Sequence, residues 1–144
     1  MVQQVTSGIK ISVETDFEGT FYKSYKMNFA FAYKVTIENQ SNDVVQLNSR
    51  YWKIKDALNN IEVVRGEGVI GQKPILQPGE SHIYNSGCLL SSPFGSMHGY
   101  YNMINFSNSN DINLLKSQQK IIPDKIIFSR FEKIINKMNA FVLN

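Results

Sequence analysis

The chain has 144 residues, of which 42% are hydrophobic and 12% aromatic, which is typical of one folded domain and too apolar for a disordered chain. Its net charge of +3 comes from residues 111–144, because the first 110 residues carry nine basic and nine acidic side chains. A body without a basic excess argues against a nucleic-acid partner, since phosphate binding needs a basic patch.

The sequence shows no sign of export or of membrane insertion. Its single cysteine, Cys88, excludes an intramolecular disulfide. Residues 1–6 lack the basic and apolar regions of a secretory signal. No apolar run approaches the roughly 20 residues needed to cross a bilayer. We therefore expect a cytoplasmic protein.

Alternating apolar residues predict β-strands through most of the first 106 residues. The alternation is clear at 9–13 and longest at 29–37, where aromatic and β-branched types dominate. Residues 15–27 lack a clean period and are expected to form a loop or a mobile hairpin tip. The pattern predicts an all-β sandwich of about seven or eight strands. Further strands are expected at 44–47, 51–54, 61–64, 81–90 and 97–106.

The C-terminal segment differs from the rest of the chain. From Asp124 onward, apolar residues such as Ile127 and Phe131 have the spacing of an amphipathic helix, and we favour a short helix there. A strand through 126–128 is the alternative. No linker or internal repeat divides the chain, so residues 1–144 are expected to form a single domain.

Residues 66–71 match the glycine pattern G-x-G-x-x-G. In a dinucleotide-binding fold this pattern opens a helix whose N-terminus binds pyrophosphate. Here prolines follow at positions 74 and 78, so no helix can form. We interpret Gly66, Gly68 and Gly71 as residues that permit positive φ or a close backbone approach. A backbone nest for an anion is the alternative interpretation.

Three charged residues lie beside these glycines: Arg50, Arg65 and Glu67. They could form surface ion pairs, which contribute little to stability. They could instead contact an anion or a peptide through the guanidinium fork. The candidate binding site therefore comprises Arg50, Arg65, Gly66, Glu67, Gly68 and Gly71.

The sequence contains no recognisable catalytic or metal-binding constellation. His82 and His98 have no further ligand at a metal-binding spacing. Ser86 and Cys88 lie outside any nucleophile motif, and Cys88 is interpreted as a small buried hydrophobe. No pair of acids stands out for general acid–base chemistry. We expect a protein that is not an enzyme and has no cofactor.

Several spaced motifs follow one another along the chain: Leu47-x-x-Arg50-Tyr51-Trp52-x-Ile54, the glycine pattern at 66–71, Pro74-x-Leu76-x-Pro78-Gly79-Glu80, Tyr84-x-Ser86-Gly87 and Pro93-x-Gly95-x-Met97-x-Gly99-x-Tyr101. In order and spacing they resemble the ApaG family over residues 8–106, whereas residues 107–144 depart from the family pattern. Trp52 is expected to anchor the core. The other structural positions that the resemblance carries over are Pro74, Pro78, Gly79, Gly95, Met97 and Gly99.

The resemblance implies an immunoglobulin- or fibronectin-III-like β-sandwich that acts as a binding module. The family is linked by name to Co²⁺ and Mg²⁺ resistance or efflux, and by gene association to diadenosine tetraphosphate metabolism, so the resemblance implies these roles as alternatives. Similar domains in eukaryotes look like protein-interaction modules.

Our first hypothesis is a non-catalytic module that binds a protein partner, pyrophosphate or a nucleotide near residues 66–71, which we call the glycine loop. A homodimer is a further option. The alternatives are an accessory factor in Co²⁺ or Mg²⁺ homeostasis and, less favoured, an enzyme acting on diadenosine tetraphosphate.

Overall fold

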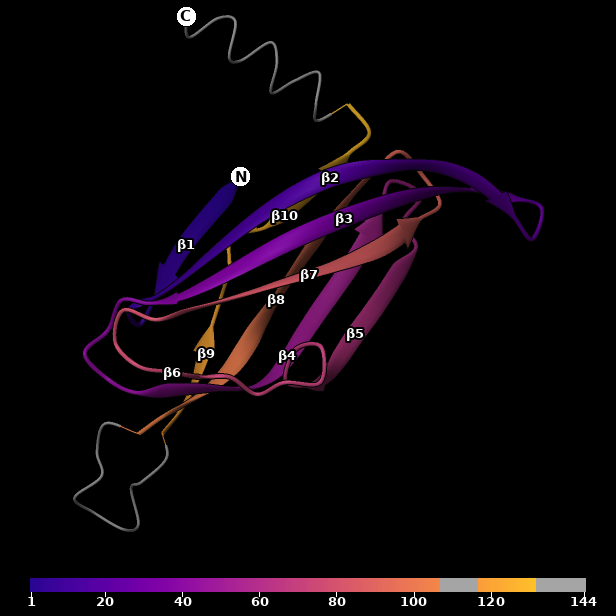
Figure 1. Ribbon diagram of the computed structural model, residues 1–144. Coiled ribbons are helices and arrows are strands. Elements are labelled where there is room, and N and C mark those ends of the chain that lie inside the picture. Colours follow the sequence, from indigo (N-terminus) through magenta and orange to yellow (C-terminus); the bar gives the residue numbers. More distant parts are fainter. Residues whose placement is uncertain (107–116, 132–144) are drawn as a thin grey trace, which may run out of the picture.

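The computed structural model describes residues 1–106 and 117–131, and these contain ten β-strands and no helix (Figure 1). Among these residues, no helix has the length and apolar character needed to cross a membrane. The strands are β1 (Val2–Thr6), β2 (Ile9–Lys23), β3 (Lys26–Asn39), β4 (Val45–Asp56), β5 (Ile61–Glu67), β6 (Ile75–Leu76), β7 (Ser81–Leu90), β8 (Phe94–Asn105), β9 (Ser117–Ile121) and β10 (Ile126–Ser129).

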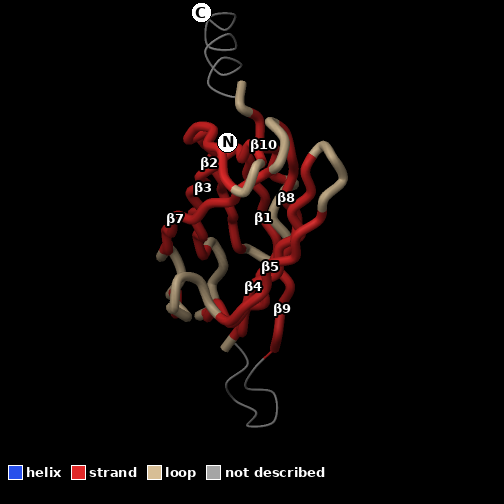
Figure 2. Tube along the Cα trace, turned by 90° about the vertical axis from the view of Figure 1, so that its right-hand side faces the viewer, coloured by secondary structure: helices blue, strands red, loops and turns tan. Residues whose placement is uncertain are grey.

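The strands form two antiparallel sheets that pack face to face (Figures 1 and 2). A four-stranded sheet has the order β1-β2-β3-β7, and a six-stranded sheet has the order β10-β8-β4-β5. The short strands β6 and β9 extend the second sheet by pairing with β4 and β8. The expected all-β sandwich is confirmed.

Period-two alternation produces the core, because successive side chains of a strand point to opposite faces of the sheet. In β3, Phe31, Val35 and Ile37 are at most 2% exposed, and the even-numbered residues of this stretch, 32, 34 and 36, face outward. Trp52 of β4, 1% exposed, meets Tyr101 of β8 edge to face, with ring centroids 5.6 Å apart. Burying each such side chain contributes roughly 1.5–3 kcal/mol to folding.

The two long sides of the sandwich differ. On one side β10 lies against β2, so that Phe128 fills the gap between the sheets, 5.3 Å from Phe31 by ring centroids. The Thr6 hydroxyl donates to the Ile122 carbonyl across the same side, at 3.1 Å. On the other side the edge strands β5 and β7 leave a cavity between the sheets. The site described below lies on this open side.

Residues 15–27 form the outer part of a long hairpin, so of the two predicted alternatives the loop is wrong and the hairpin is right. β2 and β3 stay paired as far as Lys23 and Lys26, and the turn uses Ser24 and Tyr25 with φ values of 54° and 61°. A bulge between Phe17 and Gly19 shifts the register. An inserted residue reverses the faces of all later residues, so the apolar period is lost although the strand continues.

The C-terminal segment also differs from the prediction. Ile126–Ser129 forms β10, so the favoured helix is wrong over these residues and the alternative strand is right. Ile126 and Phe128 alternate into the core and are at most 1% exposed, and this burial outweighs the helical spacing. Residues 124, 125, 130 and 131 are not helical either, and the predicted helix from residue 132 onward lies outside the described residues.

Candidate functional site

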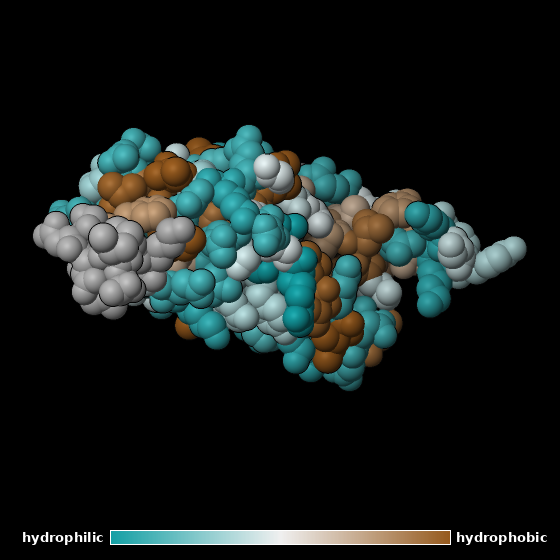
Figure 3. Space-filling view, turned by 90° about the horizontal axis from the view of Figure 1, so that it is seen from below, coloured by the Kyte–Doolittle hydropathy of each residue, from teal (hydrophilic) through white to brown (hydrophobic). Residues whose placement is uncertain are grey.

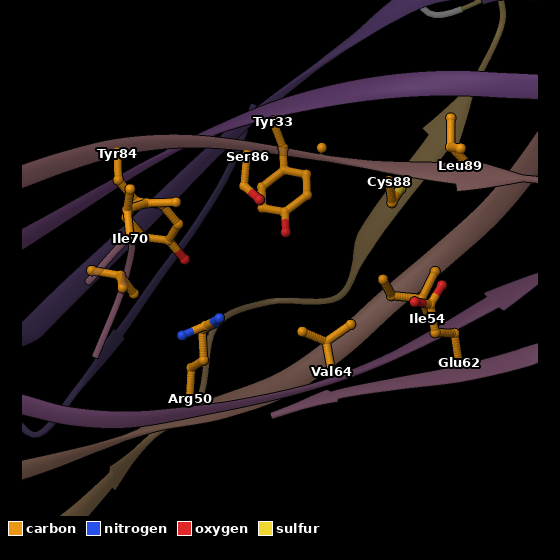
Figure 4. Close-up of a pocket in the computed structure, with 12 residues that line it drawn as sticks. Tyr33, Arg50, Ile54, Glu62, Val64, Ile70, Tyr84, Ser86, Cys88 and Leu89 are labelled. Carbon is orange, nitrogen blue, oxygen red and sulfur yellow. The ribbon is translucent and has the colours of Figure 1, made fainter. Parts of the chain in front are cut away.

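A cavity of about 360 Å³ lies between β5 and β7 on the open side of the sandwich (Figure 4). Its walls come from both sheets, and residues of the glycine loop close one end. The wall residues of the four-stranded sheet are Tyr33, Tyr84, Ser86, Gly87, Cys88 and Leu89, and those of the six-stranded sheet are Arg50, Ile54, Glu62 and Val64. Val69 and Ile70 belong to the loop.

Arg50 faces the cavity because of a second β-bulge. The register of β4 with β8 shifts between Leu47 and Ser49, so two residues of β4 oppose one of β8. Before the bulge Leu47 points inward; after it the inward series is Arg50, Trp52 and Ile54. Without the inserted residue, Arg50 would lie on the outer face of the sheet.

The Arg50 guanidinium holds the glycine loop in place. Its Nη1 donates to the Gly68 carbonyl at 2.6 Å and, more weakly, to the Glu67 carbonyl at 3.4 Å. The rest of the fork points across the cavity toward Tyr33 and Ser86 (Figure 4). In the described part of the chain no carboxylate lies within ion-pairing distance of Arg50. Glu62 lines the same cavity but does not form an ion pair with Arg50.

The glycine loop is a tight turn rather than an open nest. Val69 and Gln72 exchange backbone hydrogen bonds of 2.8 and 3.0 Å, and Ile70 and Gly71 between them have φ values of 49° and 71°. The Gly68 amide donates to the Asn48 carbonyl at 2.7 Å. These hydrogen bonds occupy three amides of the loop, which cannot then also bind an anion. The next strand is β6.

The remaining predicted residues lie around this loop or away from it. Glu67 forms an ion pair with Lys73 at 2.7 Å on the exposed surface. Gly66 leaves room for Arg50, since a Cβ there would lie 3.3 Å from Nη1. Arg65 points to the outer face of the sheet, where its Cζ lies 5.2 Å from the Tyr51 ring centroid. The structure therefore brings Arg50 together with the loop and separates Arg65 from the cavity.

None of the carried-over positions Pro74, Pro78, Gly79, Gly95, Met97 and Gly99 lines the cavity. The Pro74 carbonyl accepts from the Leu47 amide at 3.1 Å. Gly79 follows Pro78 in a turn at φ +88°. Met97 is fully buried. At Gly99 a Cβ would lie 1.9 Å from the Tyr51 carbonyl oxygen, and at Gly95 2.8 Å from that of Lys55. These two glycines let β8 approach β4 closely.

Sequence reasoning missed the wall contributed by β7. Tyr84, Ser86 and Cys88 alternate on the inward face of that strand and line the cavity. Their period-two spacing is visible in the sequence, but it does not indicate which strand faces them.

The titratable groups of this wall are neutral at physiological pH. Burial raises the pKa of Tyr84 to about 12, although the hydrogen bond with Tyr101 works in the opposite direction. Burial likewise raises the pKa of the Cys88 thiol to about 12. A thiol with so high a pKa is a poor nucleophile, because the thiolate is the reactive form. The described residues hold no group of three or more His, Cys, Asp or Glu side chains placed to bind a metal ion.

Comparison with known proteins identifies the family. The family model for the ApaG domain matches residues 20–105. A protein of Brucella canis named Protein ApaG is 43% identical over 103 residues, which cover 72% of this chain and 79% of that protein. This chain belongs to the ApaG family.

Further ApaG proteins and solved structures agree with this assignment. Protein ApaG of Beijerinckia indica is 43% identical over 104 residues, covering 72% of this chain and 80% of that protein. The crystal structure of the putative ApaA protein of Bordetella pertussis has a TM-score of 0.73 and 30% identity, covering 84% of this chain and 92% of that one. The ApaG resemblance expected from the spaced motifs is confirmed.

Proposed function

We propose that this ApaG protein is a non-catalytic binding module whose ligand enters the cavity between β5 and β7. The supporting observation is Arg50, a cation that faces a half-apolar cavity without a carboxylate partner among the described residues. A guanidinium in such a setting favours a carboxylate or phosphate group, because its fork matches their paired oxygens.

The walls indicate what else the ligand carries. Ile54, Val64 and Leu89 offer apolar contacts, whereas Tyr33 and Ser86 offer hydroxyl groups beside the guanidinium. Pockets of this kind combine apolar walls with a few polar groups that fix orientation. The ligand is thus an anionic group attached to an apolar body, either a small molecule or a side chain of a protein partner.

A protein partner could use the two edge strands that border the cavity. β5 and β7 are the last strands of their sheets on this side. An extended segment can add to such an edge through main-chain hydrogen bonds and insert alternate side chains into a neighbouring pocket. A second copy of this chain could pair in the same way.

The proposal is tested by an amide NMR titration with pyrophosphate, ATP and diadenosine tetraphosphate in turn. Saturable shifts should appear at cavity residues such as Ser86 and Cys88 and be lost in Arg50→Ala. Arg65→Ala is the matched control, because Arg65 lies on the neighbouring strand but points away from the cavity.

Arg50 also holds the loop, so Ser86→Ala provides a second variant that leaves the Gly68 contact intact. Shifts that follow Arg65 instead of Arg50 would contradict the proposed site. If none of these anions causes a response, the proposal is restricted to protein partners. It is then refuted if a protein partner that binds the wild type binds the Arg50→Ala variant equally well.

A further inference from the structure

The outer face of the six-stranded sheet carries a row of cations and tyrosines that the cavity does not involve. Arg65, Tyr51 and Tyr100 lie side by side across β5, β4 and β8. Lys120 of β9 lies opposite Asn102 of β8, and its side chain reaches the Tyr100 ring. Lys53 and Lys55 follow Tyr51 on the outward positions of β4. We call these six residues the basic face: Tyr51, Lys53, Lys55, Arg65, Tyr100 and Lys120.

The tyrosines hold the outer cations of this row in place. The two rings stack with centroids 5.2 Å apart and an interplanar angle of 17°. The Arg65 Cζ lies 5.2 Å from the Tyr51 ring centroid, and the Lys120 Nζ lies 4.6 Å from that of Tyr100. Such cation–π contacts contribute about 0.5–1 kcal/mol at exposed sites and restrict otherwise mobile side chains.

The strand register leaves the positive charge of this face uncompensated. Lys53 lies opposite Val63 on β5 and His98 on β8, and Lys55 lies opposite Ile61 and Ser96. Among the outward strand positions that the structure describes on this sheet, the one acidic residue is Glu67. It is already bonded to Lys73.

The other sheet shows the opposite arrangement. On its outer face Lys10 lies opposite Glu38, and Lys34 lies opposite Glu14. Cross-strand neighbours of opposite charge compensate one another there. Within the first 110 residues, which have no net charge, the difference between the two faces thus comes from strand pairing, and Lys120 adds a further positive charge to the basic face.

We propose that the basic face docks an acidic segment of a protein partner. Carboxylates complement the cations, and an extended segment places alternate side chains about 6.6–6.8 Å apart, which is also the spacing of Lys53 and Lys55 along β4. The tyrosine rings contact one another and a cation, so they are not open platforms on which nucleic-acid bases could stack. The observations therefore favour an acidic polypeptide over a single-stranded nucleic acid.

The test measures fluorescence anisotropy of a labelled hexaglutamate peptide titrated with the full-length protein. A labelled hexaglutamine peptide and an oligothymidylate of equal charge are the comparison probes. Wild type should bind the glutamate peptide in preference to both, and the affinity should fall as salt is raised. Lys53→Glu combined with Lys55→Glu should weaken binding about tenfold or more, since like charges then face the peptide.

The control reverses charge on the other sheet. Lys10→Glu combined with Lys34→Glu changes the net charge equally and should leave the affinity within about twofold, because exposed charges farther apart than a Debye length are screened. Tyr100→Leu keeps every charge but releases Lys120, so it should weaken binding by a smaller factor. Equal loss in the control, tighter binding of the oligothymidylate, or no binding of the glutamate peptide would each overturn the proposal.

Discussion

At the scale of single residues, Gly68 shows how closely the glycine loop is packed. It adopts φ +61°, and a Cβ there would lie 2.2 Å from the Gln72 carbonyl oxygen. Gly71 has a similar φ of +71° but open space around the position of a Cβ. Two glycines of one motif therefore meet different demands: Gly71 supplies conformation alone, and Gly68 supplies conformation and space.

We expect Gly68→Ala to lower the free energy of unfolding by more than Gly71→Ala. The left-handed conformation costs an alanine about 1–2 kcal/mol at either position, and the clash adds to that cost only at Gly68. Urea unfolding of the two variants measures the difference. Equal losses would show that the loop moves aside without cost.

A second residue-scale prediction concerns the buried pair Tyr84 and Tyr101, whose hydroxyls are hydrogen-bonded between the sheets. Burial raises the pKa of both, to about 12 for Tyr84. The folded chain thus keeps protons that the unfolded chain releases near pH 10. The resulting stability is present below about pH 10 and is lost as the pH rises toward about 12.

Thermal melts from about pH 8 to pH 11 would measure this effect. The double variant, Tyr84→Phe with Tyr101→Phe, should lose less stability over this range than wild type, because both titrating groups are removed together with their hydrogen bond. Parallel pH profiles of variant and wild type would contradict the assignment.

At the scale of elements, β10 matters because it closes one side of the sandwich. Phe128 is fully buried and its ring lies 5.3 Å from that of Phe31, whereas Phe131, three residues later, is 43% exposed. The Arg130 guanidinium lies over the rings of Phe17 and Phe29, at 5.9 and 5.8 Å. A four-residue strand therefore links β8 to β2 across the core.

Phe128→Ala should destabilise the protein by about 3–5 kcal/mol, since removal of a buried aromatic ring leaves a cavity. Phe131→Ala is the matched control and should cost far less, because its ring is partly in solvent. Chemical denaturation of both variants tests this. A small loss at Phe128 would show that β10 is dispensable for folding.

At the scale of the whole molecule, the sandwich has a closed side and an open side. β10 and β1 cover the first, and the cavity occupies the second. Residues that line the cavity are thus supported by both sheets, as the proposed binding site requires.

This asymmetry predicts a pattern of amide hydrogen exchange. The central strands β3, β4 and β8 should be the most protected, because they have partners on both sides and the core beneath them. The edge strand β5, with exposed residues at Ile61 and Val63, should exchange much faster. Equal protection of β5 and β4 would indicate that a further strand, from a second copy, covers this edge.

Much of the fold and part of the site follow from the sequence. The alternation of Phe31, Val35 and Ile37 predicts a strand with one buried face, because the direction of a side chain along a strand is a local property. The G-x-G-x-x-G spacing followed by Pro74 predicts a turn without a helix, since φ preference is local as well. These expectations needed no knowledge of a strand's partner.

The remaining features depend on pairing between distant strands. The bulge after Leu47 turns Arg50 into the cavity, and Tyr84 on β7 becomes its neighbour only through packing of the two sheets. Strand register likewise places Lys53 opposite uncharged neighbours and Lys34 opposite Glu14. The sequence by itself determined the family and most of the strands and turns, whereas the cavity and the basic face were decided by tertiary structure, because register and bulges are fixed by contacts between residues far apart in the chain.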